Sequence, residues 1–217
     1  MYRVLASEGS FVKKVPEGTE GSRVRTYLNP KTETEETVSE DVIKAFTGYI
    51  RDISLEEKDW GEVLMITLVD SEGEVLISLN ADSNFGTDFM KKIPNVDLTK
   101  EVRLAPYSFE DGDKKVRGIT VEQEGEKIYS FFSAKDGDKV TSINGFPEPE
   151  GDTSKYTKKK WRDYFGVDVY NFLRDYTVDN IVPKFEDLPP LPEEVRQMDR
   201  EAESVPNDEI NAEDIPM

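Results

Sequence analysis

The chain has 217 residues with 28 basic and 46 acidic side chains, which gives a formal net charge of -18. This length suits one sizeable domain with appendages, and the negative charge argues against non-specific attraction to duplex DNA or anionic lipid. The sequence contains neither Cys nor His, which excludes disulfides, the usual zinc ligands and the Ser-His-Asp and Cys-His triads. Most familiar hydrolase chemistry is thereby excluded.

The amino-terminal region is the least regular part of the sequence. Met1 to Ser10 lacks the basic start and apolar stretch of a signal peptide, and no apolar run is long enough to span a bilayer. We therefore expect a cytoplasmic protein with no membrane partner. Ser22 to Leu28 predicts a strand, whereas the polar stretch from Pro30 to Glu40 predicts a loop. Residues 1–40 are interpreted as an N-terminal extension.

The middle of the chain is rich in predicted strands. A first group of three antiparallel strands covers Phe46 to Leu55, Gly61 to Asp70 and Glu74 to Asn80, with a short Gly-containing turn before the third. A helix from Asp82 to Ile93 follows, and Pro94 ends it. A second group covers Glu101 to Phe109, Lys115 to Glu122 and Glu126 to Ser133.

This order of three strands, a helix and two or three further strands predicts the fold class. It matches a mainly β fold built on a five-stranded Greek-key barrel of the OB type, with an extra strand and with the helix capping one end of the barrel. We assign residues 41–134 to this barrel. The competing fold is an open α+β sheet, because a sequence does not show the spatial order of its strands.

Two amphipathic helices are predicted after the barrel, within residues 135–185. The first covers Lys155 to Phe165 and places Trp161, Tyr164 and Phe165 on one face. Gly166 is predicted to end it in a left-handed cap. The second helix begins at Asp168 and repeats apolar residues at i, i+3, i+4 and i+7, namely Val169, Phe172, Leu173 and Tyr176. Both are expected to pack on the barrel.

The last part of the chain is acidic and rich in proline. Residues 184–217 carry 11 acidic and 3 basic side chains, six of the 12 prolines lie in the last 35 residues, and no aromatic follows Phe185. Such a segment buries too little apolar surface to offset the entropy lost on ordering. Residues 186–217 are therefore predicted to form a disordered acidic tail.

No catalytic or metal-binding motif stands out. Asp111-Gly112-Asp113 and Asp136-Gly137-Asp138 lack the further oxygen ligands of a calcium loop, so turn chemistry explains both. Lys135-Asp136-Gly137 lacks the residue that nucleotidyltransferases place between the lysine and the aspartate, and no Gly-rich phosphate loop occurs. We therefore predict no enzyme activity, no cofactor and no metal.

Aromatic residues interleaved with cations give a stronger signal. Alternate residues of a strand share a face, which groups three sets: Arg103 with Tyr107 and Phe109, Lys115 with Arg117, and Lys127 with Tyr129 and Phe131. Single-stranded nucleic acids bind to such combinations, because aromatic faces stack on any base while Lys and Arg track the phosphates. The alternative is that some of these rings fill the core, as Phe and Tyr often do in small β domains.

Two further candidates lie outside the strands. Trp60 falls in the loop between the first two barrel strands, a region with which OB barrels contact oligonucleotides. Lys158, Lys159 and Lys160 precede Trp161 and form a local cationic stripe. The same stripe is equally well explained as the solvated face of a helix whose Trp161 is buried beneath it.

The end of the tail resembles a known family. Glu213, Asp214, Ile215, Pro216 and Met217 are similar to the terminal peptide of bacterial and phage single-stranded DNA-binding proteins, in which an acidic run precedes Ile-Pro and a final Phe. In that family an OB barrel and a flexible linker precede the peptide. The close match covers only these last residues, and the barrel agrees in the order of its elements.

The resemblance implies a function. It implies a protein that coats single-stranded DNA with little sequence specificity during replication, recombination or repair, and that recruits partner proteins through the terminal peptide. The chain departs from the family in ending with Met217, in its long amino-terminal extension and in its two late helices, which suggests a divergent, phage-type member. The alternative function is an OB-type adaptor that binds proteins and no nucleic acid, which the net charge of -18 favours.

Overall fold

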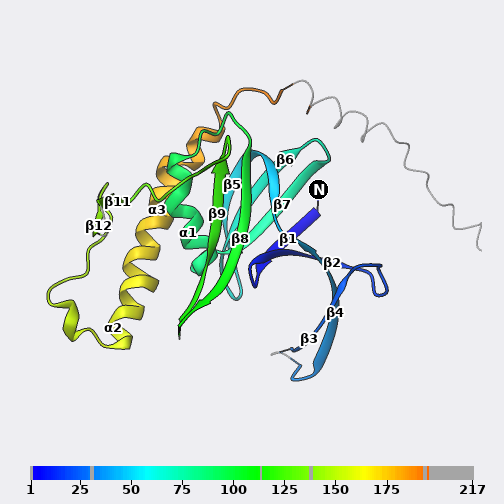
Figure 1. Cartoon of the computed structure of the whole chain (residues 1–217), viewed down its shortest axis with the longest axis horizontal. Helices are drawn as coiled ribbons and strands as arrows, with labels where there is room; N and C mark the ends of the chain where they lie inside the picture. Colours follow the sequence, from blue (N-terminus) through cyan, green and yellow to red (C-terminus); the bar gives the residue numbers. More distant parts are fainter. Residues whose placement is uncertain (1, 30–31, 113, 137–138, 193–194, 196–217) are drawn as a thin grey trace, which may run out of the picture.

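The computed structural model describes residues 2–29, 32–112, 114–136, 139–192 and 195. Ten strands form one sheet, and the helices pack on one side of it (Figure 1). The strands lie in the order β10-β9-β8-β5-β6-β7-β1-β2-β4-β3. All neighbours are antiparallel except β1 and β7, which are parallel. The predicted mainly β class is confirmed.

Five strands form the centre of the sheet, and helix α1 (Asn84–Lys92) lies between the third and fourth of them along the chain. The strands are β5 (Phe46–Lys58), β6 (Gly61–Asp70), β7 (Gly73–Asn80), β8 (Val102–Asp111) and β9 (Lys114–Gln123). The Ser83 hydroxyl accepts the Gly86 N–H and caps α1 at its start, while Pro94 lies in the 3-10 turn Ile93–Asn95 that follows it. The predicted succession of three strands, a helix and two strands is therefore observed.

The outer edges of β7 and β9 explain why this sheet is open. β7 pairs with β1 (Tyr2–Ser7). On β9, Val121 O accepts Ile128 N–H at 2.8 Å, and Ile119 N–H donates to the Asp88 carboxylate of α1 at 2.8 Å. Both edges are therefore occupied, and the described pairings include no ladder from β7 to β9. The predicted closed barrel is not found.

Residues 2–43 add four strands to the sheet. After β1 come β2 (Ser10–Val15), β3 (Arg23–Leu28) and β4 (Glu35–Ile43). The strand predicted at 22–28 is confirmed, but the loop predicted at 30–40 is wrong over Glu35 to Glu40. β4 lies between β2 and β3 and pairs with both, so two ladders outweigh its polar composition. In Figure 1, β3 and β4 project away from the helices.

The chain after β9 follows another route than predicted. β10 covers only Glu126–Lys127, and a separate hairpin forms from β11 (Ser133–Asp136) and β12 (Lys139–Ser142). Phe131 N–H donates to Lys91 O at 2.8 Å, and the Asn95 side chain donates to Tyr129 O at 3.1 Å. These contacts draw the chain from β9 toward α1, so a strand over Glu126 to Ser133 is wrong beyond its first residues.

The two predicted late helices are joined. α2 (Lys158–Asp163) runs through the π-helical segment Tyr164–Val169 directly into α3 (Tyr170–Asn180), with 3-10 turns at Thr153–Lys155 and Val182–Phe185. The left-handed stop predicted at Gly166 is wrong, because Gly166 does not adopt a positive φ. The wide π turn spaces the buried Tyr164 and Val169 five residues apart. Leu173 and Thr177, four and eight residues further on, then continue the same buried face.

The core lies between the central strands and α1 and α3. Its fully buried members include Ile53, Leu64, Ile66, Ile77, Phe89, Leu104, Ile119 and Leu173. A second layer of rings joins α3 to this core, where Phe132 contacts Phe172 and Tyr176 with centroids 5.2 and 5.0 Å apart. Among the described helices, none combines the length and apolar character required to cross a membrane.

Candidate nucleic-acid interface

One face of the β8–β9 ladder carries two neighbouring aromatic rings. Tyr107 lies opposite Gly118 and Phe109 opposite Val116, so all four residues share this face. The two ring centroids are 5.9 Å apart and the planes differ by 28°, which is a stacked arrangement. Phe109 is 53% exposed. The sequence-based grouping of Tyr107 with Phe109 therefore corresponds to a shared, accessible surface.

Helix α1 orients the Tyr107 ring. Its hydroxyl donates to the Asp88 carboxylate at 3.4 Å, and the Lys92 ammonium lies 5.9 Å from the ring centroid. Partial burial, together with the Asp88 charge and hydrogen bond, raises the pKa of the Tyr107 phenol. A side chain at Gly118 would collide with both Asp88 and the Tyr107 hydroxyl. Gly118 thus permits the close approach that fixes the ring.

The segment after β9 supplies the opposite wall. Together with the β8–β9 face it encloses a groove of about 470 Å³ lined by Lys92, Tyr107, Phe109, Val116, Thr120, Val121, Lys127, Ile128 and Tyr129. Tyr129 is 74% exposed. Lys127 is also exposed, whereas Lys92 is bound to Asp88 at 2.7 Å and to Ile119 O at 2.6 Å. We call this the aromatic groove.

Four of the sequence-predicted residues meet in the aromatic groove: Tyr107, Phe109, Lys127 and Tyr129. No protein-family model, curated protein or solved structure matches the chain. What the groove can bind therefore follows from its own chemistry. Exposed rings provide faces for stacking, and a lysine at the rim provides a partner for phosphate, which is the combination that single strands require.

Sequence reasoning missed the contribution of α1 and of the small residues on β9. Lys92 lies in the last turn of α1, and Val116 and Thr120 flank Gly118 on the groove face. A glycine in the interior of a predicted strand is itself a signal, since it often marks a close approach of another group. Gly118 is such a position.

The other predicted strand residues lie elsewhere. The Arg103 guanidinium is bound to the Glu122 carboxylate at 2.7 Å, so its charge is already paired. Lys115 and Arg117 lie opposite Glu110 and Ser108, on the other face of the ladder from Tyr107. Phe131 packs against Phe132 and Tyr176 with centroids 5.2 and 5.9 Å apart. For Phe131 the core interpretation holds: the segment after Lys127 no longer pairs with β9 as a strand, and Phe131 packs against the core instead.

Trp60 and the triple lysine do not line the aromatic groove. Trp60 lies between β5 and β6 and is 61% exposed. Lys158, Lys159 and Lys160 are exposed on α2, and the Lys160 ammonium lies 4.0 Å from the Tyr156 ring centroid. Trp161 is half-buried, stacked on Phe165 at 5.5 Å and packed against the core. This arrangement favours the interpretation of a solvated helix face with Trp161 beneath it.

Two predictions concern residues beyond this description. Glu213, Asp214, Ile215, Pro216 and Met217 lie outside the described residues, as do Asp113, Gly137 and Asp138 of the two candidate cation loops. Within the described part of the chain, no group of three or more carboxylates is placed to hold a metal ion.

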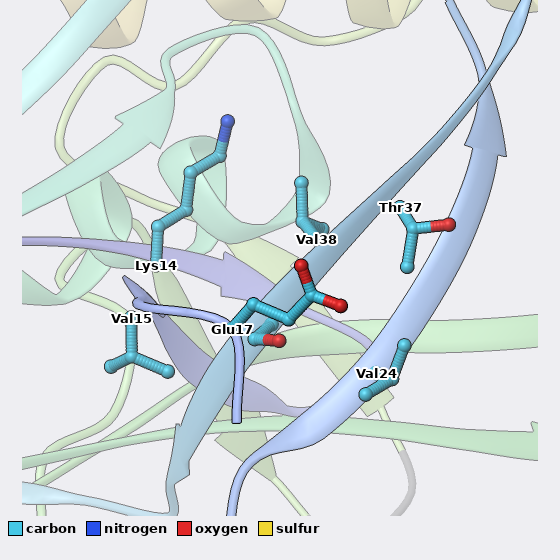
Figure 2. Close-up of a pocket in the computed structure, with 7 residues that line it drawn as sticks. Lys14, Val15, Glu17, Val24, Thr37 and Val38 are labelled. Atoms are coloured by element: carbon cyan, nitrogen blue, oxygen red, sulfur yellow. The ribbon is translucent and has the colours of Figure 1, made fainter. Parts of the chain in front are cut away.

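A second hollow lies on the projecting strands. It has a volume of about 250 Å³ and is lined by residues of β2, β3, β4 and the turn after β2. Figure 2 shows Val24 and Thr37 on the two neighbouring strands of its wall and Glu17 reaching toward them from the turn. It contains no aromatic ring, so it lacks the stacking surface of the aromatic groove.

Proposed function

We propose that this protein is a non-enzymatic single-stranded DNA-binding protein that coats unwound strands during replication, recombination or repair. The observation that carries the proposal is the convergence of Tyr107, Phe109 and Tyr129 beside Lys127 in one exposed groove. Tyr107 and Phe109 come from β8, whereas Lys127 and Tyr129 come from the segment that follows β9. Tyr129 and Phe109 are 74% and 53% exposed, so these two rings do not serve to fill the core.

The arrangement of the central strands supports an OB-type core. The order β9-β8-β5-β6-β7 is that of an OB barrel opened between its third and fifth strands, with α1 between its third and fourth strands. β5 pairs with β6 along its length and with β8 near its start, and its register shifts between Ile50 and Asp52. A shift of this kind bends a strand, so that it can serve two parts of a curved sheet.

The chemistry of the groove favours weak sequence preference. Phe109 has no hydrogen-bonding group, and the Tyr107 hydroxyl is committed to Asp88. Stacking therefore dominates over contacts to base edges, and every base has a face that can stack. We expect similar affinity for oligomers of different sequence, with differences that follow stacking strength.

A protein-interaction adaptor is the alternative function. The net charge of -18 favours it, because phosphates are repelled by an acidic protein. However, the charge is uneven, with 11 acidic and 3 basic side chains in residues 184–217. A groove rimmed by Lys127 can therefore attract phosphates locally although the whole chain is acidic. An adaptor would not respond to oligo(dT).

The proposal is tested by fluorescence anisotropy with labelled oligo(dT) and with a duplex of equal length at low salt. Binding should favour the single strand, and log affinity should fall with log salt by about 0.7 for each phosphate neutralised. Lys127→Gln should reduce this slope by roughly one such increment. Lys115→Gln, on the opposite face of the same hairpin, is the matched control and should leave the slope unchanged. Absent binding, or tighter binding of the duplex, contradicts the proposal.

A further inference from the structure

The sheet ends at β3, and this edge lacks the usual protection. No described strand pairs with the outer side of β3. Edge strands are normally shielded by charged side chains, proline, a bulge or a covering segment. β3 (Arg23–Leu28) has no proline and pairs with β4 without a bulge, and its two arginines are bound to Glu40 on the face that Val24 and Leu28 do not share. Val24 and Leu28 are each 63% exposed. An apolar, accessible edge of this kind is a template for another strand.

The two faces of β3 differ in charge. On one face, Arg23 and Arg25 bind the buried Glu40 carboxylate at 2.6 and 2.9 Å. Tyr27 on the same face donates to Glu36 at 2.8 Å. Because side chains alternate, Val24, Thr26 and Leu28 share the other face, which carries no charge. The ion pairs hold β3 in place before any partner arrives.

We propose that β3 pairs with β3 of a second copy of the chain in an antiparallel ladder centred on Thr26. In this register Val24 lies opposite Leu28 of the second copy, and Thr26 lies opposite its own counterpart. Arg25 lies opposite Tyr27 of the second copy, which repeats the contact that Arg25 makes with Tyr27 in its own chain at 5.3 Å. A register centred on Arg25 instead places two guanidinium groups opposite each other, which is unfavourable.

The hollow on the projecting strands completes the fit. Its lining combines three valines with polar and charged side chains, namely Lys14, Val15, Glu17, Val24, Thr37, Val38 and Ser39, and Figure 2 labels all of these but Ser39. Leu28 of the second copy, placed opposite Val24, lies at the mouth of this hollow. Because a two-fold axis makes the interface identical on both copies, each chain covers the exposed leucine of the other.

The contact face also explains why two acidic chains can associate. Val24, Thr26 and Leu28 are uncharged. The proposed interface also lies on β3, which together with β4 projects away from the helices (Figure 1). The repulsion between two chains of charge -18 is long-ranged and is screened by salt. Added salt should therefore strengthen the dimer, whereas it weakens binding to oligo(dT). The two proposals respond in opposite ways and fail independently.

Cysteine cross-linking tests the register, because the chain contains no cysteine of its own. In the proposed ladder, the Cα atoms of residue 26 in the two copies are about 4.5 to 5.5 Å apart, within the range of a disulfide. The control is Thr37→Cys, which lies beside Thr26 on β4. In the dimer its two copies are three strand spacings, roughly 14 Å, apart. Under mild oxidation, full-length Thr26→Cys should form a disulfide-linked dimer, whereas Thr37→Cys should form no disulfide between the two copies.

Sedimentation equilibrium of the unmodified chain and of two variants supplies the second measurement. Leu28→Glu should weaken dimerisation by about tenfold or more, since the symmetry repeats the lost contact. Adding Val24→Lys should restore it, because the new charges lie opposite each other across the axis. Both positions are exposed in the single chain, so circular dichroism should show unchanged folding. A monomeric native chain, a dimer insensitive to Leu28→Glu, or equal cross-linking of both cysteine variants overturns the proposal.

Discussion

Phe109 owes its exposure to its position near the end of the β8–β9 hairpin, beyond the reach of α1. It stacks on Tyr107, and that ring in turn is held by Asp88. If the groove binds nucleic acid as proposed, the stacked pair offers a base an aromatic face that is already formed in the unbound chain. At this scale the candidate function depends on two rings and one carboxylate.

Replacing Phe109 with Ala should weaken oligo(dT) binding by roughly 1 to 3 kcal/mol, which is the contribution of one base stacked on one ring. Phe165→Ala is the matched control, because Phe165 is 54% exposed against 53% for Phe109 and lies outside the groove. Anisotropy titrations of both variants decide the matter. An equal loss in both would show that the groove is not the preferred surface.

Glu40 is the carboxylate on which the projecting strands depend. Burial raises its pKa, but the hydrogen bonds and charges of Arg23 and Arg25 together outweigh this effect and hold the pKa below its ordinary value of 4.5. A lowered folded-state pKa adds stability above the unfolded-state value, and this stability is lost as the pH falls through the folded-state pKa.

Glu40→Gln should therefore lower the free energy of unfolding by about 1 to 3 kcal/mol at pH 7. It removes the charge that Arg25 pairs with at 2.9 Å and leaves Arg23 with only the more distant Glu8 carboxylate at 3.6 Å. The difference between native and variant chains should shrink as the pH falls below 4.5. Urea titrations at pH 7 and at several acidic values measure it. If the native chain and Glu40→Gln differed in free energy of unfolding by the same amount at every pH, the contribution of Glu40 would come from packing and not from its charge.

At the scale of elements, α1 takes the place of a strand beside β9. Asp88 and Lys92 bind the N–H and C=O of Ile119, as a neighbouring strand would, at 2.8 and 2.6 Å. The same Asp88 positions Tyr107. Asp88 therefore contributes both to the contact of α1 with β9 and to the shape of the groove.

Asp88→Ala should cost about 1 to 3 kcal/mol of folding stability, because Ile119 N–H loses its acceptor and the Lys92 ammonium loses its charged partner. The folded fraction should also bind oligo(dT) more weakly, since Tyr107 is no longer held. Asp179→Ala, at an exposed position on α3, is the control for loss of one negative charge. Unchanged affinity of folded Asp88→Ala would show that ring orientation does not matter.

At the scale of the molecule, charge is divided between a groove with lysine at its rim and an acidic carboxyl-terminal segment. Deleting Glu213 to Met217 should leave the melting temperature unchanged, because an aromatic-free, proline-rich end adds little packing. Oligo(dT) affinity should stay level or rise, since negative charge that competes with phosphate is removed. Recovery of replication or repair proteins in pull-downs should be lost, and Met217→Phe should increase it. Equal recovery from all forms would contradict the recruiting role that the resemblance of the terminal peptide implies.

The sequence by itself determined the local elements wherever the hydrophobic pattern was strong. The three strands before α1, the helix stopped by Pro94 and the β8–β9 hairpin were all predictable, because alternation and helical spacing act over a few residues. The grouping of Tyr107 with Phe109 followed from the same alternation. Within such segments, the physics that selects the structure is local and visible in the residue order.

Tertiary structure alone decided how the edges of the sheet were used. β4 forms from a polar stretch because β2 and β3 pair with it on both sides. The sheet is open, and β1, Ile128 and Asp88 occupy the edges of β7 and β9. Phe131 and Tyr129 are separated into core and groove by the bond from Phe131 N–H to Lys91 O. Each of these features depends on hydrogen bonds between segments that are far apart in the sequence. The spacing of residues within one segment therefore does not predict them.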